Sequence, residues 1–186
     1  MNLLAIEAAT EACSVGLEVN GAWLQRSSHE PRAHGRLLVP WVEELLAEAG
    51  LGFADLDAIA VDRGPGGFTS LRLGLSVAQG IALAHDLPVH PVSSLASLAL
   101  AACPESGFSG RMLAAIDARM GEIYAGWFDF ENGLPILPGR EMLVVPGRIE
   151  AVGPAVGSGP LHAAGSAFGA YHDVLVRQLG SGLVQI

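Results

Sequence analysis

The stretch Asp62-Arg63-Gly64-Pro65-Gly66-Gly67-Phe68-Thr69-Ser70-Leu71-Arg72-Leu73-Gly74 joins two predicted elements and decides how the first half of the chain folds. The apolar run 58–61 before it is typical of a buried strand, and the apolar segment 69–84 is predicted to be a helix. Glycines at positions 64, 66 and 67 lie between them and permit backbone turns that other residues disfavour. The stretch therefore predicts a strand, a tight turn and a long helix in succession.

The predicted helix contains two glycines that need a structural reason. A glycine inside a helix costs about 1 kcal/mol relative to alanine, and both Gly74 and Gly80 lie there. Ser70, Gly74 and Ala78 are spaced four apart and form a stripe of small side chains. Such a stripe allows another helix to approach closely, and packing inside one domain explains it equally well.

A glycine-rich loop between a strand and a helix is also the usual form of a phosphate-binding site. The helix N-terminus offers free N–H groups and the positive end of its dipole. The P-loop version of this site requires a lysine, but all ten Lys+Arg residues of this chain are arginines. The P-loop and lysine-based catalysis are therefore excluded, and the ligand of the turn, if any, stays open.

The composition predicts a folded soluble protein. With 186 residues, 51% hydrophobic and 16% charged, the chain is large enough for one domain or two small lobes. Its net charge of −9 disfavours direct binding to a nucleic-acid backbone. Cys13 and Cys103 provide neither a disulfide framework nor the paired spacing of a metal site. Without a signal peptide or a membrane-length apolar run, the expected compartment is the cytoplasm.

Hydrophobic periodicity predicts an α/β fold of two lobes with mixed sheets flanked by helices. The first lobe has the order β-β-β-α-β-α-β-α, with strands at 3–6, 12–19, 22–28, 56–61 and 88–92 and helices ending at 49, 84 and 102. Residues 112–128 repeat the strand, acidic turn and strand of residues 3–19. We therefore expect an N-terminal lobe over 1–103 and a smaller C-terminal lobe over 111–186, connected by 104–110.

The second lobe is less regular than the first. A further strand is predicted at 141–145, a short helix at 147–152 and a strand-like segment at 155–159. The tail 161–186 shows no clear periodicity, so no element is assigned to it.

Two lobes that each open with a strand, an acidic turn and a strand resemble the actin-like superfamily (ASKHA, ribonuclease H-like), which includes sugar kinases and heat-shock ATPases. Within it, three segments resemble the bacterial TsaB (YeaZ) family: Leu4-Ala5-Ile6-Glu7-Ala8-Ala9-Thr10-Glu11-Ala12-Cys13-Ser14-Val15, the stretch 64–74, and Ala115-Ile116-Asp117-Ala118-Arg119-Met120-Gly121-Glu122-Ile123-Tyr124. The resemblance covers residues 1–130.

The resemblance implies a non-catalytic subunit that supports a TsaD-like enzyme in threonylcarbamoyl transfer to the adenosine next to the tRNA anticodon (t6A modification). It also implies a TsaE-like ATPase as a further partner, a homodimer when the partner is absent, and contact with tRNA only through the complex. Members of the family usually continue beyond the position of Ile186, so the family's C-terminal tail is expected to be missing.

The resemblance predicts no metal and no catalytic residue in this chain. The catalytic relative holds a metal on two histidines four apart; here His34 occupies the first position and Leu38 the second, which makes His34 a helix-start or surface residue. The superfamily's first-turn aspartate is replaced by Glu7, and Thr10 could contact a phosphate. These two are the candidate cofactor residues, although we expect no bound cofactor. The alternative for Glu7 is a turn carboxylate bonded to neighbouring backbone N–H groups.

The second lobe contributes a charged turn made of Asp117, Arg119 and Glu122. It could face a cleft between the lobes or a partner, and a solvated turn explains the charges equally well.

The first two helices are the predicted partner interface. Apolar residues cover about half of the first helix, more than one sheet needs, and exposed apolar patches usually mark association sites. The predicted interface residues are Leu37, Leu38, Trp41, Ser70, Leu71, Gly74, Leu75 and Ala78.

Two other function classes stay open. They are an ATP-binding or ATP-hydrolysing enzyme of the actin-like superfamily and a metal-dependent, glycoprotease-like hydrolase. The chain has neither the Ser-His-Asp elbow nor the zinc helix motif that would indicate such enzymes.

Overall fold

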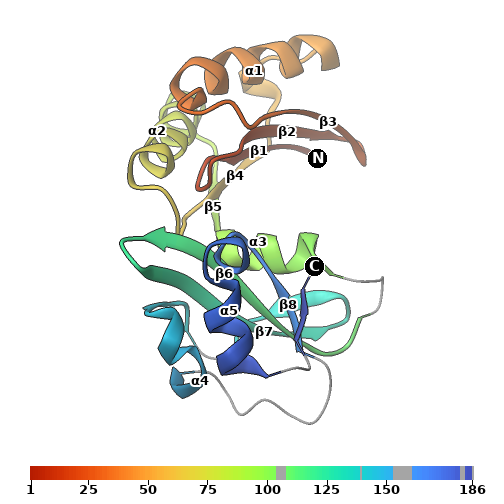
Figure 1. Cartoon of the computed structure of the whole chain (residues 1–186). Helices are drawn as coiled ribbons and strands as arrows, with labels where there is room; N and C mark the ends of the chain where they lie inside the picture. Colours follow the sequence, from red (N-terminus) through yellow and green to blue (C-terminus); the bar gives the residue numbers. More distant parts are fainter. Residues whose placement is uncertain (104–107, 139, 153–160, 181–182, 186) are drawn as a thin grey trace. The chain divides into compact units, whose positions relative to one another are not determined.

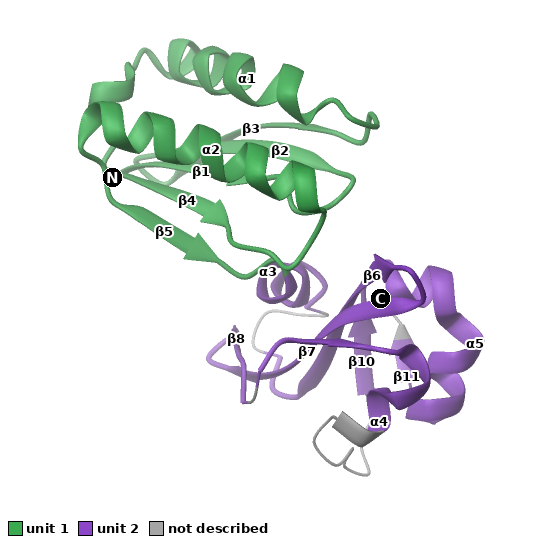
Figure 2. Ribbon diagram, turned by 90° about the vertical axis from the view of Figure 1, so that its left-hand side faces the viewer, with its two compact units in different colours: residues 1–94 green, residues 95–186 purple. Residues whose placement is uncertain are grey.

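The computed structural model describes residues 1–103, 108–138, 140–152, 161–180 and 183–185. The chain forms two compact units, residues 1–94 and 95–186 (Figure 2). The division falls before the predicted connection 104–110, of which 104–107 lie outside the described residues. It falls there because helix α3 (Ser94–Ala101) packs Leu95 and Ala99 into the core of the second unit.

The first unit is built on a five-stranded mixed sheet in the order β3-β2-β1-β4-β5 (Figure 1). Its strands are β1 (Asn2–Glu7), β2 (Cys13–Val19), β3 (Ala22–Ser28), β4 (Ala58–Asp62) and β5 (Val89–Val92). The first three form an antiparallel meander, whereas β4 and β5 run parallel to β1. Its helices are α1 (His34–Ala49), the 3-10 turn η1 (Phe53–Asp55) and α2 (Phe68–His85). Pro40 lies inside α1.

The core of the first unit lies between the sheet and the helices α1 and α2. Alternate residues of the strands point into it, as expected for strands with one face buried. The main contributors are Leu4, Ile6, Val15, Leu17, Ile59 and Val61 from the sheet and Leu38, Val42, Leu45, Leu46, Ala78 and Ala82 from the helices.

The second unit repeats the plan of the first. Its sheet has the path β11-β10-β6-β7-β8, and β9 also pairs with β7. The strands are β6 (Arg111–Arg119), β7 (Glu122–Glu131), β8 (Leu134–Ile136), β9 (Met142–Val144), β10 (Leu161–Ala164) and β11 (Leu183–Gln185). In both units the first strand is central, with an antiparallel hairpin on one side and parallel strands on the other. The predicted α/β fold with two mixed sheets flanked by helices is confirmed.

The remaining elements of the second unit are η2 (Pro146–Arg148), α4 (Ile149–Val152) and α5 (Ala167–Leu179). The tail without an assignment therefore contains β10, α5 and β11, while the strand-like segment predicted at 155–159 lies outside the described residues. No helix in the described parts of the chain is long and apolar enough to cross a membrane.

The two glycines of α2 face opposite environments. A Cβ on Gly74 would lie 3.0 Å from the Ala8 Cβ and 3.4 Å from an Asp62 carboxylate oxygen, whereas a Cβ on Gly80 would meet no atom within 4 Å. The stripe of Gly74 and Ala78 thus faces the sheet of its own unit, and packing inside one domain is the correct explanation for these two residues.

This contrast predicts opposite effects of filling the two positions. Gly74→Leu should lower the free energy of unfolding by about 1–3 kcal/mol or more, because the added atoms collide with β1 and the turn that follows it. Gly80→Ala should stabilise it by about 0.5–1 kcal/mol, because an exposed helical glycine is replaced without any contact. Urea unfolding of the two variants measures both values, and equal effects would contradict the assigned orientation of α2.

Candidate functional site

The first turn (residues 7–12, between β1 and β2) corresponds to the place where a phosphate would be expected. Three of its backbone donors are already used within the chain. Ala8 N–H donates to Asp62 Oδ1 at 3.0 Å, and Ala9 N–H donates to Glu7 Oε1 at 2.8 Å. Ala12 N–H donates to Thr10 Oγ1 at 3.2 Å. These three N–H groups are therefore not free to hold an anion.

The glycine loop (residues 64–67) closes over the same turn. Gly67 N–H donates to the Ala9 carbonyl oxygen at 2.6 Å. A Cβ at Gly66 would lie only 2.1 Å from that oxygen, so no other residue fits there without moving the backbone. On its other side, the Gly64 carbonyl accepts from Ser94 N–H at 3.0 Å. The glycine loop, whose ligand the sequence left open, is thus bonded to its own unit.

Four titratable side chains surround this junction. Asp62 is 3% exposed, and its Oδ2 has no hydrogen-bond partner in the part of the chain that the structure describes. Glu7 and Cys13 lie close enough to Asp62 for their charges to interact. His34 is 6% exposed, and its Nε2 lies 3.2 Å from the Ala12 carbonyl oxygen, which connects the start of α1 to the first turn.

Burial makes the carboxyl pair, Glu7 and Asp62, hard to ionise. Desolvation, followed by the charge of Asp62, raises the pKa of Glu7 from 4.5 to about 7 although the Ala9 N–H opposes the shift. Desolvation also raises the pKa of Asp62 to about 6, against the Ala8 N–H. Burial likewise raises the pKa of the Cys13 thiol. A site lined by two carboxyl groups repels a phosphate when they ionise.

The candidate cofactor residues have local roles in this geometry. The Glu7 carboxylate accepts from a neighbouring backbone N–H, which is the alternative considered for it, and the Thr10 hydroxyl bonds within the first turn. Among the described residues, no group of three or more His, Cys, Asp or Glu side chains could hold a metal ion.

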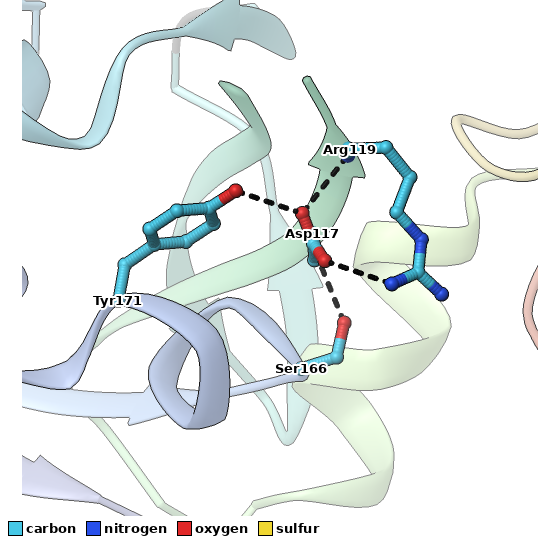
Figure 3. Close-up of polar contacts among 4 residues, drawn as sticks. All are labelled: Asp117, Arg119, Ser166 and Tyr171. Carbon is cyan, nitrogen blue, oxygen red and sulfur yellow. Dashed lines mark hydrogen bonds and ion pairs between the residues drawn. The ribbon is translucent and has the colours of Figure 1, made fainter. Parts of the chain in front are cut away.

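The charged turn of the second unit is organised around Asp117 (Figure 3). Its Oδ1 accepts from Arg119 N–H at 2.9 Å and from the Tyr171 hydroxyl at 3.2 Å, and its Oδ2 lies 3.3 Å from Arg119 Nη1. The Asp117 N–H donates to Ser166 Oγ at 3.0 Å. Desolvation and the Asp117 charge raise the pKa of Tyr171. In the backbone register of the β6–β7 hairpin, Glu122 lies opposite Arg119.

Sequence reasoning found Asp117, Arg119 and Glu122 but missed their partners. Ser166 and Tyr171 belong to the tail that had no assignment, 49 and 54 residues from Asp117 along the chain. Tyr171 departs from helical geometry inside α5, at φ −132° and ψ 30°, but this feature is visible only in the structure and gives no signal in the sequence.

Three of the eight predicted interface residues lie inside the first unit, and this corrects the prediction for those three. Gly74 and the side chains of Leu38 and Ala78 are buried, because α1 and α2 direct them at the sheet. The others are half-buried: Leu37, Trp41, Ser70, Leu71 and Leu75. The outward face of α2 includes the exposed residues Leu73, Ser76, Gly80 and Leu83, which are spaced three or four apart.

The carboxyl pair predicts a specific pH dependence of stability. Because the pKa of Glu7 is higher in the folded chain than its ordinary 4.5, the folded state holds this proton more tightly than the unfolded state. The free energy of unfolding should then decrease as the pH rises from about 4.5 to about 7, by up to about 3 kcal/mol. Glu7→Gln keeps the acceptor for Ala9 N–H and removes the ionisation. Its stability relative to wild type should increase across this window and level off above it.

Urea unfolding at a series of pH values measures this difference. Glu43→Gln removes an exposed carboxylate from α1 and serves as the control, which should follow wild type throughout. A Glu7→Gln profile parallel to wild type at every pH would show that the carboxyl pair does not bind its proton on folding.

Comparison with known proteins places these features in a family. The family model described as TsaD: tRNA N6-adenosine threonylcarbamoyltransferase matches residues 27–141. The tRNA threonylcarbamoyladenosine biosynthesis protein TsaB of Escherichia coli (strain K12) is 44% identical over 137 residues, which are 72% of this chain and 58% of that protein. The protein of the same name from Haemophilus influenzae is 44% identical over 124 residues, which are 67% of this chain and 52% of that protein.

A solved structure agrees over nearly the whole chain. YeaZ from Pseudomonas aeruginosa has a TM-score of 0.86 and 40% sequence identity, and the match covers 99% of this chain and 82% of that chain. The matched part of the chain spans little more than half of the two curated relatives. The chain belongs to the TsaB (YeaZ) family.

Proposed function

We propose that the chain is a non-catalytic, cytoplasmic subunit that binds a TsaD-like enzyme and supports threonylcarbamoyl transfer to the adenosine next to the tRNA anticodon. The observation that carries the proposal is the closed first turn. Its N–H groups at Ala8, Ala9 and Ala12 bond to side chains of the chain itself, and the glycine loop covers Ala9. The fold is shared with nucleotide-handling proteins, but in this chain the first turn is engaged in the packing of its own unit. This favours a binding role over a catalytic one.

The partner surface proposed for this subunit is the outward face of α2. Leu83 is 88% exposed and Leu73 is 37% exposed, and the small Ser76 and Gly80 lie between them. Two exposed leucines around a small-residue gap allow a facing helix to approach closely and to bury apolar surface. Val39 of α1, 45% exposed, adds to the apolar area of the two-helix layer.

The same face serves a second copy of the chain when the TsaD-like enzyme is absent. A two-fold pair would place Gly80 of each copy near the symmetry axis, where the lack of a side chain matters most. A TsaE-like ATPase joins the complex, and tRNA is held by the complex rather than by this chain, whose net charge of −9 repels a phosphate backbone.

Reconstitution tests the proposed role directly. The TsaD-like enzyme should transfer the threonylcarbamoyl group to tRNA with this chain present and lose most of that activity without it, whereas this chain alone should be inactive. Transfer that is independent of this chain, or that this chain performs alone, would contradict the proposal.

A substitution on the outward face should separate association from folding. Gly80→Arg places a long charged side chain in the centre of the proposed contact, and we expect about a hundredfold weaker binding to the TsaD-like enzyme and loss of the homodimer. Calorimetric titration and light scattering measure the two associations, and circular dichroism should stay native because Gly80 has open space around it.

Gln25→Arg is the matched control, since it introduces the same charge on the exposed edge strand β3. It should bind as wild type does. Equal affinities of Gly80→Arg and Gln25→Arg would show that the outward face of α2 is not the interface.

A further inference from the structure

The carboxyl pair is held on two consecutive backbone donors of the first turn. Asp62 Oδ1 accepts from Ala8 N–H at 3.0 Å, and Glu7 Oε1 accepts from Ala9 N–H at 2.8 Å. Because neighbouring peptide nitrogens are close together, the two carboxyl groups are close as well. Asp62 is 3% exposed, and its Oδ2 has no hydrogen-bond partner among the described residues. Two negative charges at this position repel one another with little water to screen them.

The titratable groups that face the pair come from β1, β2 and α1. Glu7 ends β1, Cys13 begins β2, and His34 begins α1, where its positive charge favours an ionised Asp62. Helix α2 faces Asp62 with Gly74, which carries no charge. No Lys or Arg side chain in the described parts of the chain forms an ion pair with either carboxyl group. A proton on one carboxyl group removes the repulsion while the turn stays closed.

The glycine loop and the start of α2 close this part of the first unit. Gly67 N–H donates to the Ala9 carbonyl oxygen at 2.6 Å, and Gly66 lies so close to the same oxygen that no side chain fits there. Helix α2 begins at Phe68, directly after the loop, and a Cβ on its Gly74 would lie 3.4 Å from an Asp62 carboxylate oxygen. Hydration of Asp62 therefore requires the loop and the first turn of α2 to move.

We propose that the carboxyl pair is a proton-operated latch on the glycine loop: with a proton on the pair the loop stays closed, and without one it opens to let water reach the two charges. Opening breaks the bond between Gly67 and Ala9 and releases the first residues of α2. The closed loop is the major state, and the proton sets how often the loop opens. This regulation goes beyond the proposed function, and its test needs no partner protein.

The direction of the pH effect follows from burial. Desolvation, and then the charge of Asp62, raises the pKa of Glu7 from 4.5 to about 7, and desolvation raises the pKa of Asp62 from 3.8 to about 6. Because both pKa values are higher in the closed state than in water, bound protons stabilise the closed loop. This stabilisation is fully present below the two ordinary pKa values and is lost as the pH rises through about 6 and then about 7.

Amide hydrogen exchange followed by NMR tests the latch in the whole chain. The protection of Gly67 N–H, corrected for the intrinsic exchange rate, should fall about tenfold between pH 6 and pH 8 in the wild type. Glu7→Gln keeps an acceptor for Ala9 N–H but cannot ionise, so it should lose most of this fall. Glu43→Gln is the matched control on α1 and should behave as wild type. An equal fall in wild type and Glu7→Gln would overturn the latch.

Low concentrations of urea separate opening of the loop from unfolding of the whole unit. Ile59 N–H, which donates to the Pro88 carbonyl oxygen at 3.0 Å near the start of β4, reports on global unfolding, so its exchange should accelerate with urea. Exchange of Gly67 should not respond to the same concentrations, because opening a loop exposes little surface. Parallel acceleration of both amides would also overturn the latch, since the loop would then open only when the unit unfolds.

Discussion

The close approach of the glycine loop to Ala9 is the contact on which the first unit depends. Gly67 N–H bonds to the Ala9 carbonyl, and the space at Gly66 is too small for any side chain. This contact fixes the end of β4 beside the end of β1, so that Asp62 reaches Ala8 N–H. It also sets the start of α2, whose Gly74 then lies directly on Ala8.

The same contact accompanies a first turn whose backbone donors at Ala8, Ala9 and Ala12 are used within the chain. An open first turn would present three N–H groups to an anion, but here two carboxylates and a hydroxyl occupy them. The carboxylates lie where desolvation raises their pKa, to about 7 for Glu7 and about 6 for Asp62. The first turn is thus engaged in the packing of its own unit, and the exposed apolar side chains of the described residues include Leu83 on α2 and Met120 on the β6–β7 hairpin.

Much of the fold follows from local signals in the sequence, and the parts that do not are set by distant contacts. Alternating apolar residues and the Asn20-Gly21 pair are local, so the meander and the internal repeat were predictable. The direction in which the Gly74 stripe faces was not predictable, because a row of small residues fits a buried face and an interface equally well. Only the structure shows that Gly74 lies against Ala8 of its own unit. The four-residue β10 pairs with β6 about 50 positions earlier, beyond the reach of any local pattern.

The central claim is that the first turn is closed by the chain itself, and calorimetric titration of the purified chain with Mg-ATP tests it most directly. The account predicts no saturable binding up to millimolar nucleotide, because the donors at Ala8, Ala9 and Ala12 are engaged and the nearby carboxyl pair disfavours phosphate. Stoichiometric binding that Thr10→Val abolishes would contradict it, since the turn would then open to receive the nucleotide.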